Sequence, residues 1–294
     1  MSLSRARAAT ALALLVATSA TACTALEEKP APARHTGAPA PYANRQAGQL
    51  KMPLDAYASN DAETYAVEDA QDILMRRCMN NLGLEWKALP RVPSRDIGPP
   101  NLRRYGVVAA EAVRYGYHPP PDPASVVRRN HAWDEREGLP AAVQRAAYGP
   151  SGKGGCLKAA QHQLVGDTAP PDYHAFNQLT GTALDASRHA PEVRRAVRGW
   201  HACMAKEGFD YPDPLSAAGS QRWNTAEPTP AERHTARADV ACQQSAQLVT
   251  VWAAAETRIQ RQLIRHHTDR LHEAEARKNR WLTAAYRVLN RAGS

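Results

Sequence analysis

Cysteine is the residue type in this chain that offers the most chemistry, and it occurs five times, at positions 23, 78, 156, 203 and 242. Cysteines of exported proteins usually pair as disulfides, so an odd number leaves one thiol that needs its own explanation. The chain has no C-x-x-C motif and no histidine at ligand spacing from a pair of cysteines. We therefore expect no metal site and no cofactor, and one cysteine that differs in role from the other four.

The residues before Cys23 have the order of a secretory signal. Arg5 and Arg7 form a short basic region, and the uncharged stretch 8–22 ends in small residues directly before the cysteine. A basic start, a short apolar stretch and a small-residue cleavage site are typical of exported proteins. The apolar stretch is shorter than the ~20 residues that a membrane-spanning helix needs. The sequence thus predicts export and cleavage of this segment.

Two kinds of cleavage fit the end of the signal. Residues 20–22, Ala-Thr-Ala, suit an ordinary signal peptidase, and with Cys23 they resemble a bacterial lipobox in which alanine replaces the usual leucine at position −3. Lipidation of Cys23 accounts for the odd cysteine, whereas secretion leaves a free thiol. We favour lipidation, which makes 1–22 the signal peptide, 23–50 the lipidated cysteine with a flexible Pro/Ala tether, and 51–294 the folded domain.

The other four cysteines belong to an internal repeat of two motifs. Residues 78–86 (CMNNLGLEW) and 203–211 (CMAKEGFDY) share the pattern C-M-x-x-x-G-[LF]-[ED]-[WY]. Residues 156–161 (CLKAAQ) and 242–247 (CQQSAQ) share the pattern C-x-x-[AS]-A-Q. Because the two motifs alternate in the same order, the simplest interpretation is a domain of two related halves.

The halves cover about residues 60–166 and 170–294, and each contains two cysteines. Four cysteines allow three pairings, and the sequence by itself does not select one. The repeat favours one disulfide inside each half. The favoured pairs are Cys78 with Cys156 and Cys203 with Cys242.

The fold class predicted for residues 51–294 is mainly α. The helix through each first motif should end at its glycine, Gly83 or Gly208, because glycine tolerates the left-handed terminating conformation. Residues 87–138 are rich in proline, which predicts an irregular insertion with one short helix around 107–115. After Pro230 there is no proline or glycine up to Ala292, which predicts one long helix of ~90 Å or two helices.

The charge pattern predicts a basic surface near the C-terminus. The formal net charge is +8 for the whole chain, and it falls to +6 when the two arginines of the signal are removed. Residues 256–294 contain nine Lys/Arg and four acidic residues. Such a face suits an anionic membrane, an anionic wall polymer or an acidic partner, and a solvated helix face without a partner is the alternative. An exported protein is a poor candidate for binding nucleic acid. The expected docking residues are Arg258, Arg261, Arg265, Arg270, Arg277, Lys278 and Arg280.

Motifs of known enzyme classes are absent from the sequence. There is no G-x-S-x-G, no H-E-x-x-H and no dinucleotide-binding fingerprint, and the glycine-rich segment 149–155 lacks the spacing of a phosphate loop. Glu85 and Asp210 occupy equivalent positions of the repeat, and a facing pair of carboxylates could hydrolyse a glycosidic bond. A hydrolase would need that pair, or a histidine–carboxylate pair, in a pocket. A structural role at a helix end is commoner for such residues, so we expect binding in preference to catalysis.

Several of these features together resemble a protein family. The signal ending at Cys23, the paired C-M-x-x-x-G motifs, RRYGVVAAEAVRYGYHPP at 103–120 and GGCLKAA at 154–160 resemble uncharacterised secreted lipoproteins of streptomycete-type actinobacteria. The resemblance covers most of residues 50–270. It implies a lipid anchor on the outer face of the cytoplasmic membrane, but it carries no assigned activity. Similar proteins are encoded near export-type transporters with peptidoglycan-binding partners, which implies an accessory role at a transporter as one alternative.

Overall fold

The folded part of the chain is built from helices. The computed structural model describes residues 50–98, 105, 112–152, 154–171 and 173–292, and within these ranges no strand occurs. These residues belong to one compact unit. The expected signal peptide and Cys23, with nearly all of the tether, lie outside the described residues. None of the described helices combines the length and apolar character that crossing a membrane requires.

The first disulfide joins two helices of the first half. Helix α2 (Asp61–Asn81) begins at Asn60, whose side chain accepts a hydrogen bond from the Glu63 backbone, and it packs on α6 (Gly155–Val165). Cys78 of α2 is bonded to Cys156 of α6, with their Cα atoms 5.7 Å apart. Helix α5 (Ala141–Tyr148) completes this first disulfide unit. The buried side chains around the bond include Met75, Met79, Trp86 and Ala160.

The second disulfide joins two helices of the second half in the same way. Helix α8 (Pro191–Lys206) has proline in its first turn, and α10 (Pro230–Ser245) begins with a capping box between Thr229 and Glu232. Cys203 of α8 is bonded to Cys242 of α10, with a Cα–Cα distance of 5.5 Å. The expected pairing is therefore confirmed for both halves. In the chain-entropy account each bond stabilises the fold by about 4 kcal/mol.

The repeated C-M-x-x-x-G motif has the same backbone conformation in both halves. The glycines have positive φ angles, 72° at Gly83 and 84° at Gly208. The residue after each glycine donates a backbone hydrogen bond to the methionine carbonyl, over 3.0 Å in the first motif and 2.9 Å in the second. Both methionines, Met79 and Met204, are fully buried. The motif is thus a helix end that returns the chain to the core.

The C-terminal segment is divided into three helices, where one or two were expected. They are α10, α11 (Leu248–His266) and α12 (Thr268–Ala292), and the last is the expected long C-terminal helix, with 25 residues. The first break is at Gln247, which has a φ of 51°, and the second is at His267. Neither residue is glycine or proline. The sequence therefore carried no conventional signal for the breaks.

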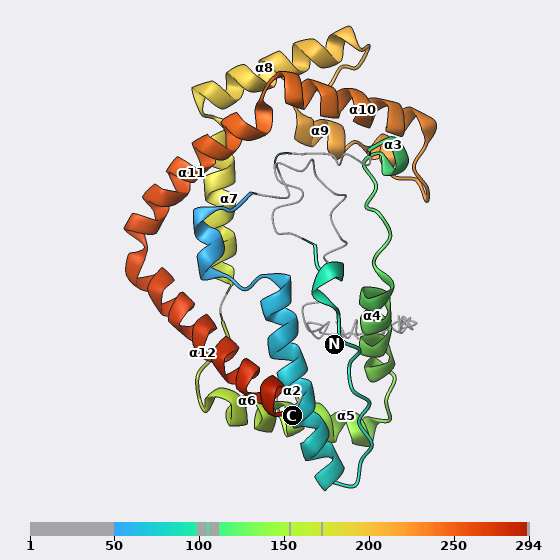
Figure 1. Ribbon diagram of the computed structural model, residues 1–294, viewed down its shortest axis with the longest axis vertical. Helices are drawn as coiled ribbons and strands as arrows, with labels where there is room; N and C mark the ends of the chain where they lie inside the picture. The colour runs from blue at the N-terminus through green and yellow to red at the C-terminus, as the bar shows by residue number, and fades with distance from the viewer. Residues whose placement is uncertain (1–49, 99–104, 106–111, 153, 172, 293–294) are drawn as a thin grey trace, which may run out of the picture. The chain divides into compact units, whose positions relative to one another are not determined.

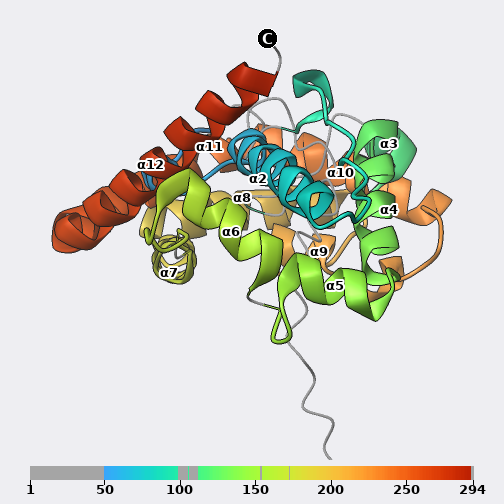
Figure 2. The same cartoon turned by 90° about the horizontal axis from the view of Figure 1, so that it is seen from below.

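These three helices connect the two disulfide units. Helix α11 packs on α7 (His174–Arg188) and α8, and α12 packs on α2 and α6. Figures 1 and 2 show α2, α5 and α6 together at one end of the described unit and α8, α9 (Pro214–Ala218) and α10 together at the other. A third core lies between α8 and α11. It contains Tyr105, Val193, Leu248 and Trp252, and Tyr105 stacks on Trp252 with a centroid separation of 4.9 Å.

The proline-rich insertion contains more helix than expected. It includes the 3-10 turn η2 (Ser94–Asp96) and the short helix α3 (Ala112–Tyr115). It also includes helix α4 (Ala124–Glu137), which the sequence did not predict. The part of the expected helix before Ala112 lies outside the described residues. Helix α4 buries charged residues on its inner face. Arg129 is 1% exposed and bonds to Glu68, Asp69 and the Pro90 carbonyl. An apolar period could not reveal such a face.

Two glycine substitutions should change stability with opposite signs. Gly208→Ala should lower the free energy of unfolding by about 1 kcal/mol, because its φ of 84° is unfavourable for alanine although the space for a Cβ atom is open. Gly181→Ala, in the exposed face of α7 with equally open space, should raise it by up to about 1 kcal/mol. Urea unfolding of both variants measures the two changes in the free energy of unfolding. Equal effects at the two positions would contradict the assigned helix end.

Candidate functional site beside the second disulfide

The two carboxylates proposed for hydrolysis do not form a site. Glu85 and Asp210 are both exposed, and they follow helices α2 and α8, which lie at opposite ends of the described unit (Figure 1). Asp210 lies 3.5 Å from the His201 ring, also near the surface. Neither carboxylate lines the hollow beside Arg270 and Leu271 of α12 or the hollow beside His118. The pair therefore lacks the facing geometry that glycoside hydrolysis requires.

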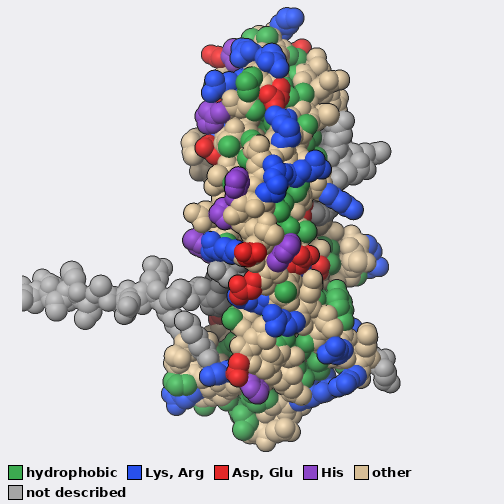
Figure 3. All heavy atoms as spheres, turned by 90° about the vertical axis from the view of Figure 1, so that its left-hand side faces the viewer, with side chains coloured by type: hydrophobic (Ala, Val, Ile, Leu, Met, Phe, Trp, Pro, Cys, Tyr) green, Lys and Arg blue, Asp and Glu red, His purple; other side chains and the backbone are tan. Residues whose placement is uncertain are grey.

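The expected basic residues of α11 and α12 largely face solvent. Figure 3 looks onto this side of the molecule and shows Lys and Arg side chains along its whole height, with histidine and acidic side chains among them. Arg258 is paired with Glu192, and Arg277 with Glu273 at 2.6 Å. No ion pair to a carboxylate is found within the described residues for the exposed arginines Arg261, Arg265, Arg270 and Arg280.

Lys278 does not belong to this face, which corrects one of the predicted docking residues. It is 7% exposed, and its Nζ donates to the carbonyl oxygens of Ala56 at 2.6 Å and Ala58 at 3.4 Å. It lies on the buried side of α12 and joins this helix to the 3-10 turn η1 (Pro53–Tyr57). Its role is therefore to hold the N-terminal part of the domain, which charge counting along the sequence could not distinguish from surface exposure.

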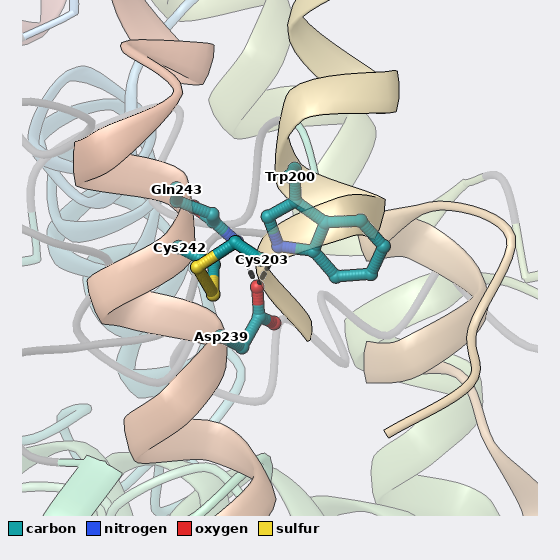
Figure 4. Close-up of a disulfide and its surroundings, with 5 residues drawn as sticks. All are labelled: Trp200, Cys203, Asp239, Cys242 and Gln243. Carbon is teal, nitrogen blue, oxygen red and sulfur yellow. Dashed lines mark hydrogen bonds between the residues drawn. A yellow bond between two sulfur atoms is a disulfide. The ribbon is translucent and has the colours of Figure 1, made fainter. Parts of the chain in front are cut away.

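The most unusual group of the described structure is the buried carboxyl of Asp239, beside the second disulfide. Its Oδ1 accepts hydrogen bonds from the Trp200 indole at 2.6 Å and the Gln243 amide at 2.9 Å (Figure 4). Its Oδ2 accepts from the Tyr117 hydroxyl at 3.0 Å. Asp239 is 0% exposed, and no cation pairs with it in the described part of the chain. Burial therefore raises the pKa of Asp239 to about 7, against the effect of its three hydrogen bonds.

A second buried carboxylate, Glu232, holds the chain segment that follows α3. Its Oε1 accepts from the backbone amides of Tyr117 at 2.7 Å and His118 at 3.0 Å, and it lies 2.7 Å from His118 Nδ1. Glu232 is 0% exposed and stands in the first turn of α10, where the helix dipole favours a negative charge. Gly116 is required next to it, because a Cβ atom there would come within 2.6 Å of the carboxylate.

The geometry around His118 requires a doubly protonated ring. Its Nδ1 faces the Glu232 carboxylate, and its Nε2 lies 2.8 Å from the Thr225 carbonyl oxygen, which can only accept a hydrogen bond. Both ring nitrogens must therefore donate. Partial burial opposes the charge, but the bonds to Thr225 and Glu232 outweigh it and raise the pKa of His118. A charged ring with both nitrogens occupied is a structural clamp and is unavailable as a general base.

A shallow hollow of about 430 Å³ opens next to this clamp. Trp223 lies at its edge and stacks on Tyr117, with centroids 5.6 Å apart and an interplanar angle of 22°. The hollow offers hydroxyl, amide and imidazolium groups, which suit a polar or anionic ligand. Its lining residues are Tyr117, His118, Pro119, Ala218, Gly219, Ser220, Gln221, Trp223 and Asn224. Within the described residues no group of His, Cys, Asp and Glu has the arrangement of a metal site.

This network could not be recognised in the sequence, although two signals for it are present. Asp239 precedes Cys242 by three residues and Trp200 precedes Cys203 by three, so both share the disulfide face of their helices. An aspartate at a core position of a predicted helix is itself unusual. The partners Tyr117 and His118 lie more than 100 residues away from Glu232 and Asp239 along the chain, and only the fold brings them together.

Replacing His118 should destabilise the fold in a pH-dependent manner. Since the pKa of His118 is raised in the folded state, its contribution is fully present below the unfolded value of about 6.5 and is lost as the pH rises through the folded value. The free energy of unfolding lost in His118→Gln should thus be largest at pH 5.5 and smaller at pH 8.5. Chemical denaturation across this range measures it, with exposed His131→Gln as control. A difference that grows with pH would contradict the charged clamp.

No known family model, curated protein sequence or solved structure matches this chain. The two disulfide units, the network around Asp239 and the basic surface of α11 and α12 are therefore the observations from which its function is argued.

Proposed function

We propose that this chain is a membrane-anchored extracytoplasmic lipoprotein that acts by binding at the cell envelope, with the lipid on Cys23. The observation that carries the proposal is the pairing of the other four cysteines within the two repeat halves. Disulfides persist in oxidising compartments, and this pairing leaves Cys23 as the cysteine available for lipidation. The lipobox-like residues before Cys23 and the proline-containing segment after it agree with this role.

A binding role is favoured over hydrolysis by the positions of the titratable groups. Glu232 and His118 hold chain segments together, with both nitrogens of the imidazole occupied. Glu85 and Asp210 are exposed and separate, so these two carboxylates do not supply the acid and base pair that the hydrolase alternative requires. An accessory role at a membrane transporter would be one form of binding, and it requires a partner that recognises a surface of this chain.

The surface best suited to such binding is the basic face of α11 and α12, defined by Arg258, Arg261, Arg265, Arg270, Arg277 and Arg280. In α11 the three arginines are spaced so that they lie on one side of the helix, and the only acid of this helix, Glu256, is fully buried. A lipid anchor would keep this face close to anionic headgroups. Each arginine near such a surface contributes about 1 kcal/mol of attraction.

The lipid anchor is tested by replacing Cys23. In a Cys23→Ala protein produced in an actinobacterial host, we expect no incorporation of labelled fatty acid and transfer of the protein from the membrane fraction to the medium. Thr24→Ala keeps the cysteine and should behave as the wild type. Membrane-bound, lipid-labelled Cys23→Ala protein would overturn the anchor.

The docking face is tested by removing two of its arginines. Arg261→Gln combined with Arg265→Gln should weaken binding of the purified chain to vesicles with anionic lipid by about thirtyfold, since each arginine contributes about 1 kcal/mol. Arg76→Gln with Arg77→Gln, at exposed positions of α2, changes the net charge equally and is the matched control. Vesicle sedimentation at several salt concentrations measures the difference. An equal loss in both double variants, or a loss insensitive to salt, would contradict this face.

A further inference from the structure

The two disulfides share one asymmetry, which concerns the exposure of their two cysteines. Cys156 and Cys242 are buried, with exposed fractions of 1% and 0%, whereas Cys78 and Cys203 are only partly buried. A thiolate from outside would therefore reach Cys78 or Cys203, and the buried cysteine would become the leaving group. A thiolate in apolar surroundings is costly, so departure of the buried sulfur requires a proton.

The two disulfides differ in what lies beside the buried sulfur. Asp239 stands one turn before Cys242 on the same side of α10, and its carboxyl is held by Trp200, one turn before Cys203 on α8 (Figure 4). In the first unit, the residue three positions before Cys156 is Lys153. The buried carboxylate of that unit, Asp72, is paired with the guanidinium of Arg136. The buried carboxyl beside the second disulfide, Asp239, thus has no cation partner within the described residues, whereas the buried carboxyl of the first unit has one.

The surroundings of Asp239 keep a proton on it close to neutral pH. The groups that face it are the Tyr117 hydroxyl, the Trp200 indole and the Gln243 amide, and its pKa of about 7 follows from burial without a cation. Glu232 and His118, in the neighbouring part of the network, form their own ion pair. Oδ1 accepts two N–H groups and Oδ2 accepts the Tyr117 O–H group, so none of these three neighbours takes the proton of Asp239. Burial raises the pKa of Tyr117, so its hydroxyl keeps its own proton.

We propose that Cys203–Cys242 is an exchangeable disulfide, at which a thiolate of a partner protein attacks Cys203 while Asp239 gives its proton to the departing Cys242 sulfur. The partner sulfur forms a bond to Cys203 Sγ. The Cys203–Cys242 bond breaks, and its electron pair goes to Cys242 Sγ, which takes the proton from Asp239. The products are a mixed disulfide at Cys203, a thiol at Cys242 and a carboxylate at Asp239.

A partner with a second thiol completes the exchange. Its second thiolate attacks the partner's own sulfur in the mixed disulfide and releases Cys203 as a thiolate, which takes a proton from water. The partner dithiol is then oxidised to a disulfide, and Cys203–Cys242 is reduced to two thiols. Two electrons and two protons have moved, and no further oxidant is needed for this single turnover. The reaction is independent of the lipid anchor and of the basic face of α11 and α12.

The first test compares the two disulfides within the same wild-type molecule. The purified full chain is treated with excess 2-mercaptoethanol between pH 6 and 8, quenched by alkylation and analysed by peptide mass spectrometry. We expect Cys203–Cys242 to be reduced about tenfold faster than Cys78–Cys156, with the mixed disulfide at Cys203. The rate divided by the thiolate concentration should fall as the pH rises through about 7, because Asp239 loses its proton there. A flat profile, or equal rates at both bonds, would overturn the proposal.

The second test uses Asp239→Asn, whose amide can still accept from Trp200 and Gln243 and can donate to Tyr117. Loss of the proton donor should slow reduction of Cys203–Cys242 about tenfold and remove its pH dependence. If Asp239 only held the helices together, the variant would be looser and its reduction faster, which would overturn the proposal. Cys78–Cys156 serves as the internal control, since unfolding would accelerate reduction of both bonds. If both bonds of the variant are reduced faster, the pH dependence of Cys203–Cys242 reduction in the wild-type chain decides whether the proposal holds.

Discussion

Buried carboxylates determine how the helices of this protein fit together. Asp72, Glu232, Asp239 and Glu256 are each at most 5% exposed, and each accepts hydrogen bonds from groups distant in the sequence or on a neighbouring helix. A buried carboxylate with partners is tolerable, whereas one that loses a partner costs several kcal/mol. The sequence supplies few large aromatic side chains, only 6% of residues, so apolar packing alone would define the helix contacts poorly. The hydrogen bonds to these buried carboxylates, together with the two disulfides, therefore specify how the helices pack on one another.

This use of acidic residues also shapes the surface of the molecule. Carboxylates placed in the interior cannot balance the exposed arginines, and the outer side of α11 shows the result, because its only acid is Glu256 in the core. The positive outer side of α11 is thus a consequence of the internal position of its one acid. Lys278 shows the reverse case, a cation placed inside to satisfy two backbone carbonyls of the N-terminal turn.

Local features of this fold could be predicted from the sequence, whereas long-range polar contacts could not. The repeat predicted both disulfides and both glycine-terminated helix ends, because each depends on short motifs with a fixed spacing. The breaks at Gln247 and His267 escaped prediction, since they separate helices with different packing partners. Helix α10 packs on α3 and α8, α11 on α7 and α8, and α12 on α2 and α6. Helix α4 escaped because arginines replace apolar residues on its inner face. The Asp239 site joins segments more than 100 residues apart, which no local pattern encodes.

The same local motif surrounds each disulfide, but the electrostatic environments have diverged. Each unit contains a buried aspartate that accepts an indole N–H, Asp72 from Trp86 and Asp239 from Trp200. The first is neutralised by Arg136, which is also stacked on the Trp86 ring. The second has only neutral donors, so its charge is disfavoured and its proton is retained near neutral pH. A purely structural duplication would be served equally well by the ion-paired arrangement in both halves. Retaining an unpaired carboxyl beside only one buried sulfur costs stability, which is lost as the pH rises from about 4 to about 7. That cost is most simply explained if this unit has a chemical task that the other lacks.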